Sequence, residues 1–255
     1  MTALITGASS GIGRSLALLF ARNGYDVLLV ARREEALREL AGEITSIGRT
    51  ARVIPIDLAV NGGAQRLFDQ LAREGVRVDV LVNNAGVGAM GTVAEIPLDR
   101  QLAMIELNIT TLTILTRLLL PGMLERRAGG VLNVGSTASF QPGPLMAVYY
   151  ASKAYVLSFT EALAEEVTGS GVKVCCLAPG PTHTGFAREA SMETSRLFSL
   201  GAMSADEVAR IGFEGWTAGK RLVVAGTMNR IGALTVRFAP RALALKVTKR
   251  LNASR

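Results

Sequence analysis

Short apolar runs alternate along this chain with longer stretches in which apolar residues recur at helical spacing. The runs predict about seven β-strands, at residues 2–6, 26–31, 50–56, 79–82, 131–134, 172–177 and 221–225. Residues 64–74 and 98–127 are typical of helices, and the second stretch carries Asn108 in its middle and a predicted bend or break at Pro121. Strands that alternate with helices favour an α/β fold, a doubly wound parallel sheet with helices on both faces.

Glycines and polar residues follow directly after most of the predicted strands. They lie at residues 7–13, at Asp57, at residues 83–86, at Ser136 and at residues 179–184. The carboxyl ends of parallel strands meet at one edge of a sheet, and ligands of such sheets bind there. We therefore expect these segments to form a single site.

The first of these segments, after the first strand, has glycines at Gly7, Gly11 and Gly13 and leads into an amphipathic helix. Glycines allow a close approach of the backbone to a ligand, and the N-terminus of a helix offers free N–H groups to an anion. The spacing G-x-x-x-G-x-G differs from the general G-x-G-x-x-G fingerprint. A tight connection alone would also explain the glycines, but their position after the first strand favours a dinucleotide site.

The second strand ends at Ala31, where an NAD-binding protein usually has an acidic residue for the ribose hydroxyls. Arg32 and Arg33 follow instead. Arg32 could pair with a 2′-phosphate, so NADP(H) is favoured over NAD(H). We interpret Arg33 as the solvated beginning of the next helix.

Tyr149 and Lys153 lie four residues apart, so they share one face of a predicted helix, whereas Tyr150 is rotated by about 100°. A neighbouring ammonium favours the phenolate and would lower the pKa of Tyr149 toward the working range. Ser136 could then hydrogen-bond the oxygen on which Tyr149 acts. A tyrosine and a lysine one turn apart are also common on surfaces, and it is the surrounding pattern that favours catalysis.

The order of these motifs resembles that of the short-chain dehydrogenase/reductase family over about residues 1–225. The matching segments are residues 6–13, residues 83–86, Asn108, Ser136, Tyr149-x-x-x-Lys153 and Pro179-Gly180. The resemblance implies that Tyr149 is the general acid or base, that Lys153 lowers its pKa and holds the nicotinamide ribose, and that Ser136 orients the substrate oxygen. It also implies that Asn108 holds a water in a proton relay. Gly135 departs from the family, which often has serine there.

The resemblance further implies a set of cofactor-binding residues. They are Gly7, Ser9, Ser10, Gly11, Ile12, Gly13, Arg32, Asp57, Leu58, Asn84, Ala85, Gly86, Tyr149, Lys153, Pro179, Gly180, Thr182 and Thr184. Within this set Asp57 would contact adenine, Asn84 and Gly86 would flank the adenosine side, and Thr184 would reach the nicotinamide carboxamide.

We expect residues 1–255 to form one Rossmann-type domain. Residues 186–215 would cover the substrate, and their apolar content favours a hydrophobic substrate. Cys175 and Cys176 are interpreted as core thiols, and His183 is the sole histidine, so we expect no metal site. No run of 18 apolar residues is present and the first strand begins at once, so we expect a cytoplasmic protein.

Residues 226–255 form a predicted basic helical extension. From residue 215 onward there are nine Lys/Arg and no Asp/Glu, so the net charge of +7 comes from this end of the chain. After Pro240, the residues Leu243, Val247 and Leu251 recur at helical spacing. Such a stripe can pack on protein or lie on an anionic membrane surface, and we favour packing, near the substrate entrance or a subunit interface. Nucleic-acid binding is not expected, because few aromatic residues are interleaved with the basic ones.

The sequence thus predicts an NADP(H)-dependent oxidoreductase that interconverts a small-molecule carbonyl and an alcohol, and we expect a homodimer or homotetramer. A second hypothesis is a dinucleotide-sensing binding protein of the same fold that does not catalyse, and a third is a module held at a membrane surface by its tail. The presence of Asn108, Ser136, Tyr149 and Lys153 together argues against the sensor, which need not retain all four.

Overall fold

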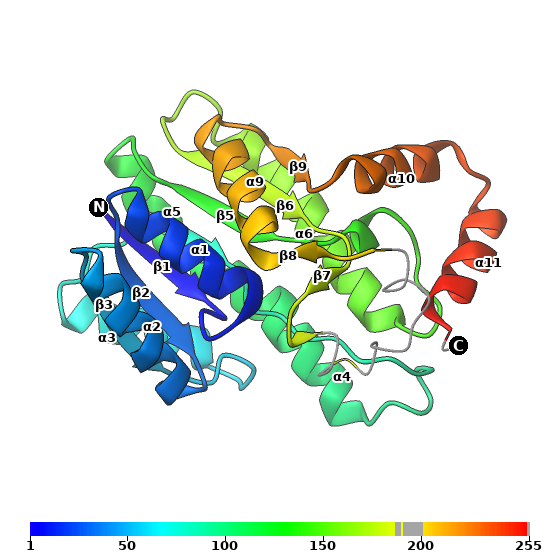
Figure 1. Cartoon of the computed structure of the whole chain (residues 1–255), viewed down its shortest axis with the longest axis horizontal. Helices are drawn as coiled ribbons and strands as arrows, with labels where there is room; N and C mark the ends of the chain where they lie inside the picture. Colours follow the sequence, from blue (N-terminus) through cyan, green and yellow to red (C-terminus); the bar gives the residue numbers. More distant parts are fainter. Residues whose placement is uncertain (187–189, 191–200, 254–255) are drawn as a thin grey trace.

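The computed structural model describes residues 1–186, 190 and 201–253. Seven parallel strands form one sheet in the order β3-β2-β1-β4-β5-β6-β9 (Figure 1). The strands are β1 Thr2–Thr6, β2 Asp26–Ala31, β3 Ala51–Pro55, β4 Val80–Asn83, β5 Gly130–Val134, β6 Lys173–Ala178 and β9 Leu222–Val224. The predicted doubly wound sheet is confirmed. The order changes direction beside β1, because β2 and β4 both pair with it.

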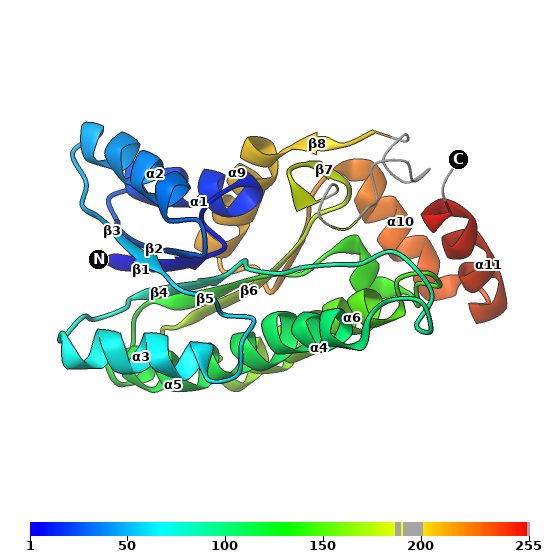
Figure 2. The same cartoon turned by 90° about the horizontal axis from the view of Figure 1, so that it is seen from below.

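Helices cover both faces of the sheet, as Figure 2 shows edge-on. One face carries α1 Gly11–Arg22, α2 Glu34–Ser46 and α9 Ala205–Thr217, and the other carries α3 Gly63–Arg73, α5 Leu112–Glu125 and α6 Ala147–Glu166. The alternation of side chains along a strand divides the core between the two faces. In β1, Ala3 and Ile5 belong to the first core cluster, and Leu4 belongs to the second.

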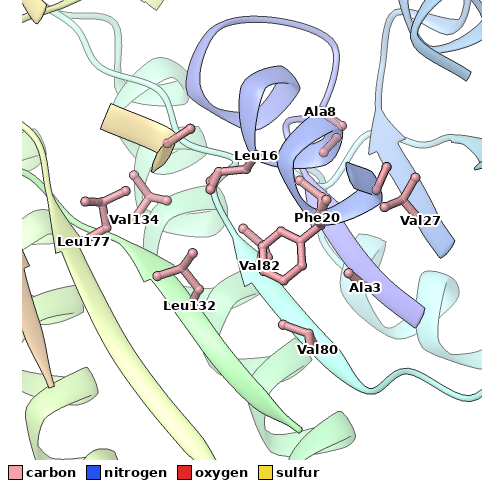
Figure 3. Close-up of a cluster of buried hydrophobic side chains, with 14 of the residues drawn as sticks. Ala3, Ala8, Leu16, Phe20, Val27, Val80, Val82, Leu132, Val134 and Leu177 are labelled. Carbon is pink, nitrogen blue, oxygen red and sulfur yellow. The ribbon is translucent and has the colours of Figure 1, made fainter. Parts of the chain in front are cut away.

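Phe20 of α1 is the largest side chain in the first cluster that is completely buried. It lies over β1 and β4, close to Ala3, Val80 and Val82 (Figure 3). The Phe20 ring also meets the ring of Phe213 of α9 edge to face, with ring centres 4.9 Å apart. The second half of the predicted substrate-covering segment, residues 205–215, is therefore part of α9 and packs on this core.

The long predicted helix at 98–127 has an irregular middle. It consists of α4 Leu98–Ile105, a π-helical segment η1 Glu106–Thr111 and α5. The predicted break at Pro121 is wrong, since α5 continues through it to Glu125. Leu98–Glu125 is long and apolar enough to span a bilayer by length and composition alone, but Leu115 and Met123 are buried in the second core cluster. We therefore describe it as a core helix.

A chain of hydrogen-bonded, buried polar side chains joins the neighbouring strands β4 and β5 to the helices α5 and α6. Asn83 donates from Nδ2 to Oδ1 of Asn133 at 2.9 Å and to Oγ1 of Thr116 at 3.1 Å. Asn133 in turn donates from Nδ2 to Oγ1 of Thr160 at 2.9 Å. All four side chains are at most 4% exposed, so these bonds replace the water that the amides would otherwise bind.

Beyond β6, the chain has two short strands that the apolar pattern did not predict and two helices within the predicted helical extension. Two short strands, β7 Thr182–His183 and β8 Met203–Ser204, pair in parallel. The remaining part of the predicted substrate-covering segment, 187–189 and 191–200, lies outside the described residues. Two helices, α10 Thr227–Phe238 and α11 Arg241–Asn252, then extend over the far end of the domain (Figures 1 and 2).

Helix α11 packs with a different face from the predicted one. Leu243 and Val247 are 54% and 46% exposed, whereas Ala244, Thr248 and Asn252 are buried. The predicted stripe was wrong for Leu243 and Val247, where the buried face lies one position further on, about 100° round the helix, whereas Leu251 is partly buried and lines the pocket described below. Small and polar residues allow this helix to approach the domain closely, and Leu243, Leu245 and Val247 are left outside.

Candidate active site

A pocket of about 300 Å³ lies along the carboxyl edge of the sheet and reaches from the glycine turn to Tyr149. The predicted residues that line it are Gly7, Ser9, Ser10, Gly11, Ile12, Arg32, Asp57, Leu58, Asn84, Ala85, Gly86, Ser136, Tyr149, Lys153, Pro179, Gly180, Thr182 and Thr184. Gly13 and Asn108, which were also predicted, do not line the pocket and lie behind it. The fold thus brings seven separate parts of the chain to one cavity.

The glycine turn between β1 and α1 leaves the N-terminus of α1 open toward the pocket. Gly7 and Gly11 have φ values of +67° and +54°, which side-chain-bearing residues rarely adopt. Ser10 precedes the helix without a side-chain capping bond, so the first N–H groups of α1 are not capped by it. A Cβ on Gly13 would lie 2.3 Å from Nδ2 of Asn84 and from the Gly7 carbonyl oxygen. Gly13 therefore allows α1 to pack tightly under the turn.

Asn84 and Thr6 fix the position of this turn. Asn84 donates from Nδ2 to the carbonyl oxygens of Thr6 and Gly7 at 2.8 and 3.2 Å. The backbone N–H groups of Asn84 and Ala85 both donate to Oγ1 of Thr6 at 3.0 Å. The amide nitrogen of Asn84, predicted to flank the adenosine side, is thus occupied in holding β4 to β1.

Two arginines lie where the pocket passes the end of β2. Both Arg32 and Arg33 are exposed and line the pocket. The interpretation of Arg33 as merely solvated is wrong, because its guanidinium donates from Nη2 to Oγ of Ser9 at 3.2 Å and to the Ser9 carbonyl at 3.3 Å. Arg33 therefore adds positive charge directly beside the glycine turn.

Ser136, Tyr149 and Lys153 meet at the opposite end of the pocket. Ser136 follows β5, and its hydroxyl accepts from the Ala138 N–H at 3.0 Å and lies beside the side chain of Tyr149 at this end of the pocket. Tyr149 and Lys153 lie in the first two turns of α6, and Nζ of Lys153 is 5.9 Å from the centre of the Tyr149 ring. The ammonium donates to the Val134 carbonyl at 2.9 Å, which leaves two of its three N–H groups for other acceptors.

Burial dominates the protonation of both groups. It raises the pKa of Tyr149 to about 12, although the hydrogen bond from Ser136 opposes this. Desolvation lowers the pKa of Lys153 to about 8, because the charged form loses its hydration. The prediction that the pKa of Tyr149 lies below its ordinary value is therefore wrong for the protein without cofactor. Tyr149 is held as a neutral phenol, a proton donor, at neutral pH.

Asn108 lies in the π-helical segment, and its side chain connects two parts of the site. Its Nδ2 donates to the Val87 carbonyl at 3.0 Å and to Oγ of Ser152 at 2.9 Å, and its Oδ1 accepts from the Val87 N–H at 3.0 Å. Ser152 donates onward to the Tyr149 carbonyl at 2.7 Å. Both amide hydrogens are thus used by protein groups, and the side chain has no donor left for a relay water.

The residues of the pocket fit a dinucleotide. The glycine turn and the uncapped N-terminus of α1 suit a pyrophosphate, since N–H groups there bind anions. The exposed guanidinium groups of Arg32 and Arg33 suit a further phosphate on the adenosine side. Lys153 offers its remaining N–H groups to ribose hydroxyls at the end where Tyr149 stands.

The comparisons with known proteins agree with this geometry. A family model described as short chain dehydrogenase matches residues 1–195. The chain belongs to the short chain dehydrogenase family. A structure of a family member, the short-chain dehydrogenase from Sphingobium yanoikuyae in complex with NADPH, is 31% identical with a TM-score of 0.83, and the match covers 93% of each chain. A structure titled for the stereoselectivity of a 7β-hydroxysteroid dehydrogenase is 26% identical with a TM-score of 0.87, covering 97% of this chain and 96% of that one.

Curated members of the family match a shorter part of the chain. The very-long-chain 3-oxoacyl-CoA reductase of Anas platyrhynchos is 39% identical over 184 residues, which are 69% of this chain and 58% of the relative. Sulfoacetaldehyde reductase 2 of Chromohalobacter salexigens is 40% identical over 185 residues, 72% of this chain and 73% of the relative. The match spans 60% of a short chain dehydrogenase of Pseudocercospora fijiensis. Residues beyond 195 are outside the family model.

Sequence reasoning missed several residues that hold this short chain dehydrogenase site together. Ser139 donates to the Lys153 carbonyl at 2.7 Å, and Ser152 connects Asn108 to Tyr149. Thr248 and Leu251 of α11 line the same pocket as Tyr149. Ser152 lies three residues after Tyr149, so helical spacing could have indicated it. Packing of the tail near the substrate entrance or a subunit interface was expected from its apolar spacing, but no local pattern indicates that Thr248 lines the pocket.

Proposed function

We propose that the protein is an NADP(H)-dependent oxidoreductase that reduces a carbonyl to an alcohol, or catalyses the reverse reaction, on a hydrophobic substrate. One observation carries the proposal: Ser136, Tyr149 and Lys153 converge at the end of a cavity whose other end suits a dinucleotide. Membership of the short chain dehydrogenase family supports it.

The bound nicotinamide would supply or accept the hydride at the carbonyl carbon. Ser136 and Tyr149 would both hydrogen-bond the substrate oxygen, since the two side chains lie side by side at the same end of the pocket. In reduction, Tyr149 gives its proton to that oxygen as negative charge develops on it. Lys153 would stabilise the phenolate that results, because a nearby ammonium favours the charged form. In oxidation the phenolate would take the proton from the alcohol.

The preference for NADP(H) rests on charge at the end of β2. Ala31 supplies no carboxylate for ribose hydroxyls, and Arg32 and Arg33 supply two guanidinium groups. An arginine can form two parallel hydrogen bonds to a phosphate, which makes this a strong charge-assisted pair. The related Sphingobium protein was solved in complex with NADPH.

The preference for a hydrophobic substrate rests on the walls beside Tyr149. Phe186 lies with its ring centre 5.4 Å from that of Tyr149, and Leu251 of α11 lines the same part of the molecule. Among the similar proteins, the names of a very-long-chain 3-oxoacyl-CoA reductase and a 7β-hydroxysteroid dehydrogenase support an apolar substrate, whereas the name of sulfoacetaldehyde reductase 2 does not.

The test is a panel of aldehydes and ketones assayed by loss of NADPH absorbance. Tyr149→Phe should abolish turnover and leave NADPH binding largely intact. Tyr150→Phe should reduce turnover far less. Tyr155→Phe is a matched control, because Tyr155 lies on the same helix and its hydroxyl bonds Oγ1 of Thr113 at 2.8 Å outside the pocket. Equal losses from Tyr149→Phe and Tyr155→Phe would refute the assignment. Tight NADPH binding with no turnover on any compound would instead support the dinucleotide-sensing protein.

We also propose a homo-oligomer. Leu98, Leu102 and Ile105 are 69%, 54% and 40% exposed and recur on one face of α4, an apolar stripe that would be covered by another subunit. Light scattering after gel filtration measures the mass directly, and a monomer at micromolar concentration would contradict this.

A further inference from the structure

The C-terminal helix α11 reaches the catalytic end of the pocket from a distant part of the chain. Thr248 and Leu251 line the cavity together with Tyr149 and Phe186. Thr248 is 4% exposed. The substrate end of the pocket thus has a wall built from the last described helix.

Asn252, the last residue of α11, is completely buried and is tied to two other segments. Its Oδ1 accepts from the hydroxyl of Tyr150 at 3.0 Å, and its Nδ2 donates to the Pro144 carbonyl at 2.9 Å. Each half of the side-chain amide therefore has a partner. An apolar residue of similar size at this position would leave the Tyr150 hydroxyl and the Pro144 carbonyl without those bonds.

The partners of Asn252 belong to the catalytic region. Tyr150 lies in α6 beside Tyr149, and the two rings meet edge to face with centres 6.1 Å apart. The loop before α6 crosses the Tyr150 ring so closely that a Cβ on Gly143 would lie 2.2 Å from it. One amide thus joins the end of α11, this loop and the first turn of the catalytic helix.

The rest of α11 offers little that would hold it in place. Leu243, Leu245 and Val247 are 54%, 39% and 46% exposed, and the buried face of the helix consists of Ala244, Thr248 and Asn252. A helix held by small side chains depends strongly on its polar contacts, because burial of an alanine removes little apolar surface from water.

We propose that Asn252 is a positioning residue that latches α11 to Tyr150 and the Pro144 loop, so that Thr248 and Leu251 form a wall that selects carbonyl substrates with a long apolar chain. The inference rests on the proposed function, which it extends to a substrate class. Leu251 would contact the chain of the substrate while Ser136 and Tyr149 hold its carbonyl oxygen.

The latch is tested without turnover by hydrogen–deuterium exchange of residues 241–252 in the full-length protein with NADPH. Tyr150→Phe should speed exchange of α11 by about tenfold, the effect of about one lost buried hydrogen bond, and Asn252→Leu, which loses two such bonds, should speed it further. Tyr155→Phe removes a comparable hydroxyl from the same helix and should leave α11 unchanged. Unchanged exchange in Tyr150→Phe and in any folded Asn252→Leu protein would overturn the latch.

The wall is tested with methyl ketones from 2-butanone to 2-decanone and NADPH. Leu251→Ala should reduce the preference in kcat/KM for 2-decanone over 2-butanone by about tenfold, through a higher KM for the longer ketone. Asn252→Leu and Tyr150→Phe should shift the preference in the same direction. Val247→Ala is the control, since Val247 lies on the outer face of the same helix. An unchanged preference in Leu251→Ala would overturn the wall.

The two proposals fail in different ways. If the unaltered protein reduces no ketone and no compound of the wider panel, the proposed function is refuted, and so is the proposed selection of substrates by Thr248 and Leu251. The exchange rates still test whether Asn252 holds α11 in place. If the ketones are reduced but Leu251→Ala and Val247→Ala behave alike, the function stands and the wall is wrong.

Discussion

The buried ammonium of Lys153 should cost the folded protein stability at neutral pH, and Lys153→Met removes this cost. The side chain is 6% exposed, and desolvation lowers its pKa from its ordinary value of 10.5 to about 8. The unfolded chain therefore binds the proton more tightly than the folded one. This difference corresponds to about 3 kcal/mol of lost stability at pH 7 and about 2 kcal/mol at pH 9.

The sign of the pH dependence follows from these values. Because the pKa of Lys153 is lower in the folded state than in the unfolded state, the loss in free energy of unfolding is complete below pH 8. It disappears as the pH rises toward 10.5. The gain from Lys153→Met should thus be smaller at pH 9 than at pH 7, by about 1 kcal/mol. Lys153→Met also loses the hydrogen bond to the Val134 carbonyl, which reduces the gain in free energy of unfolding by about 1 kcal/mol at both pH values. This loss therefore cancels when the gains at pH 7 and pH 9 are compared.

Urea unfolding of the wild type and Lys153→Met at pH 7 and pH 9, without cofactor, measures this difference. Burial also raises the pKa of Cys175, Cys176 and Tyr149 to about 12. Loss of the Lys153 ammonium raises the pKa of Cys176 further, but all three groups stay protonated in both folded proteins up to pH 9, so their contributions to the comparison cancel. Lys246→Met, at an exposed position of α11, should show no such pH-dependent gain. If the effect of Lys153→Met were the same at both pH values, the ammonium would not be desolvated as the structure indicates. Turnover should be lost in Lys153→Met in either case.

Three further results are expected. Arg32→Ala and Arg33→Ala should each weaken NADPH binding more than NADH binding in a fluorescence titration, by about tenfold for a lost charge-assisted contact, and tighter binding of NADH by the unaltered protein would contradict the preference. Gly143→Ala should lower stability by about 1–3 kcal/mol, because its Cβ would overlap the Tyr150 ring, and an unchanged melting temperature would refute this packing. Removal of residues 241–255 should lower the melting temperature with little dependence on lipid. Salt-sensitive binding to anionic liposomes that is lost on truncation, without loss of stability, would show instead that the tail lies on membranes.

The strands and the residues that follow them could be predicted because both depend on local pattern. A parallel sheet buried on both faces requires short continuous apolar runs, and its topology gathers whatever follows those runs at one edge. Ser136 after β5 and Asp57 after β3 therefore lie on the pocket without any long-range information.

The features that sequence reasoning missed depend on contacts between distant segments. Tyr150 and Asn252 are 102 positions apart, and neither has a neighbouring motif that marks the bond. The pKa of Tyr149 was predicted in the wrong direction because the lysine was considered and the burial of the phenol was not. Helix α11 was rotated in the prediction because large apolar residues were expected inside, whereas the close approach to the domain selects Ala244 and Thr248.

The buried amides of Asn83 and Asn133 bear on how accurately Ser136 is placed. Asn83 and Asn133 are register partners in β4 and β5, and Ser136 follows β5 by two residues. A slip of β5 by one residue would move Ser136 by about 3.3 Å along the strand and turn Asn133 to the opposite face of the sheet. The slipped form would lose the bonds to Asn83 and Thr160, at about 1–3 kcal/mol for each buried group left unpaired. A hydrophobic strand alone tolerates such misalignment far better, so the polar pair fixes the register of β5 and with it the position of Ser136 beside Tyr149.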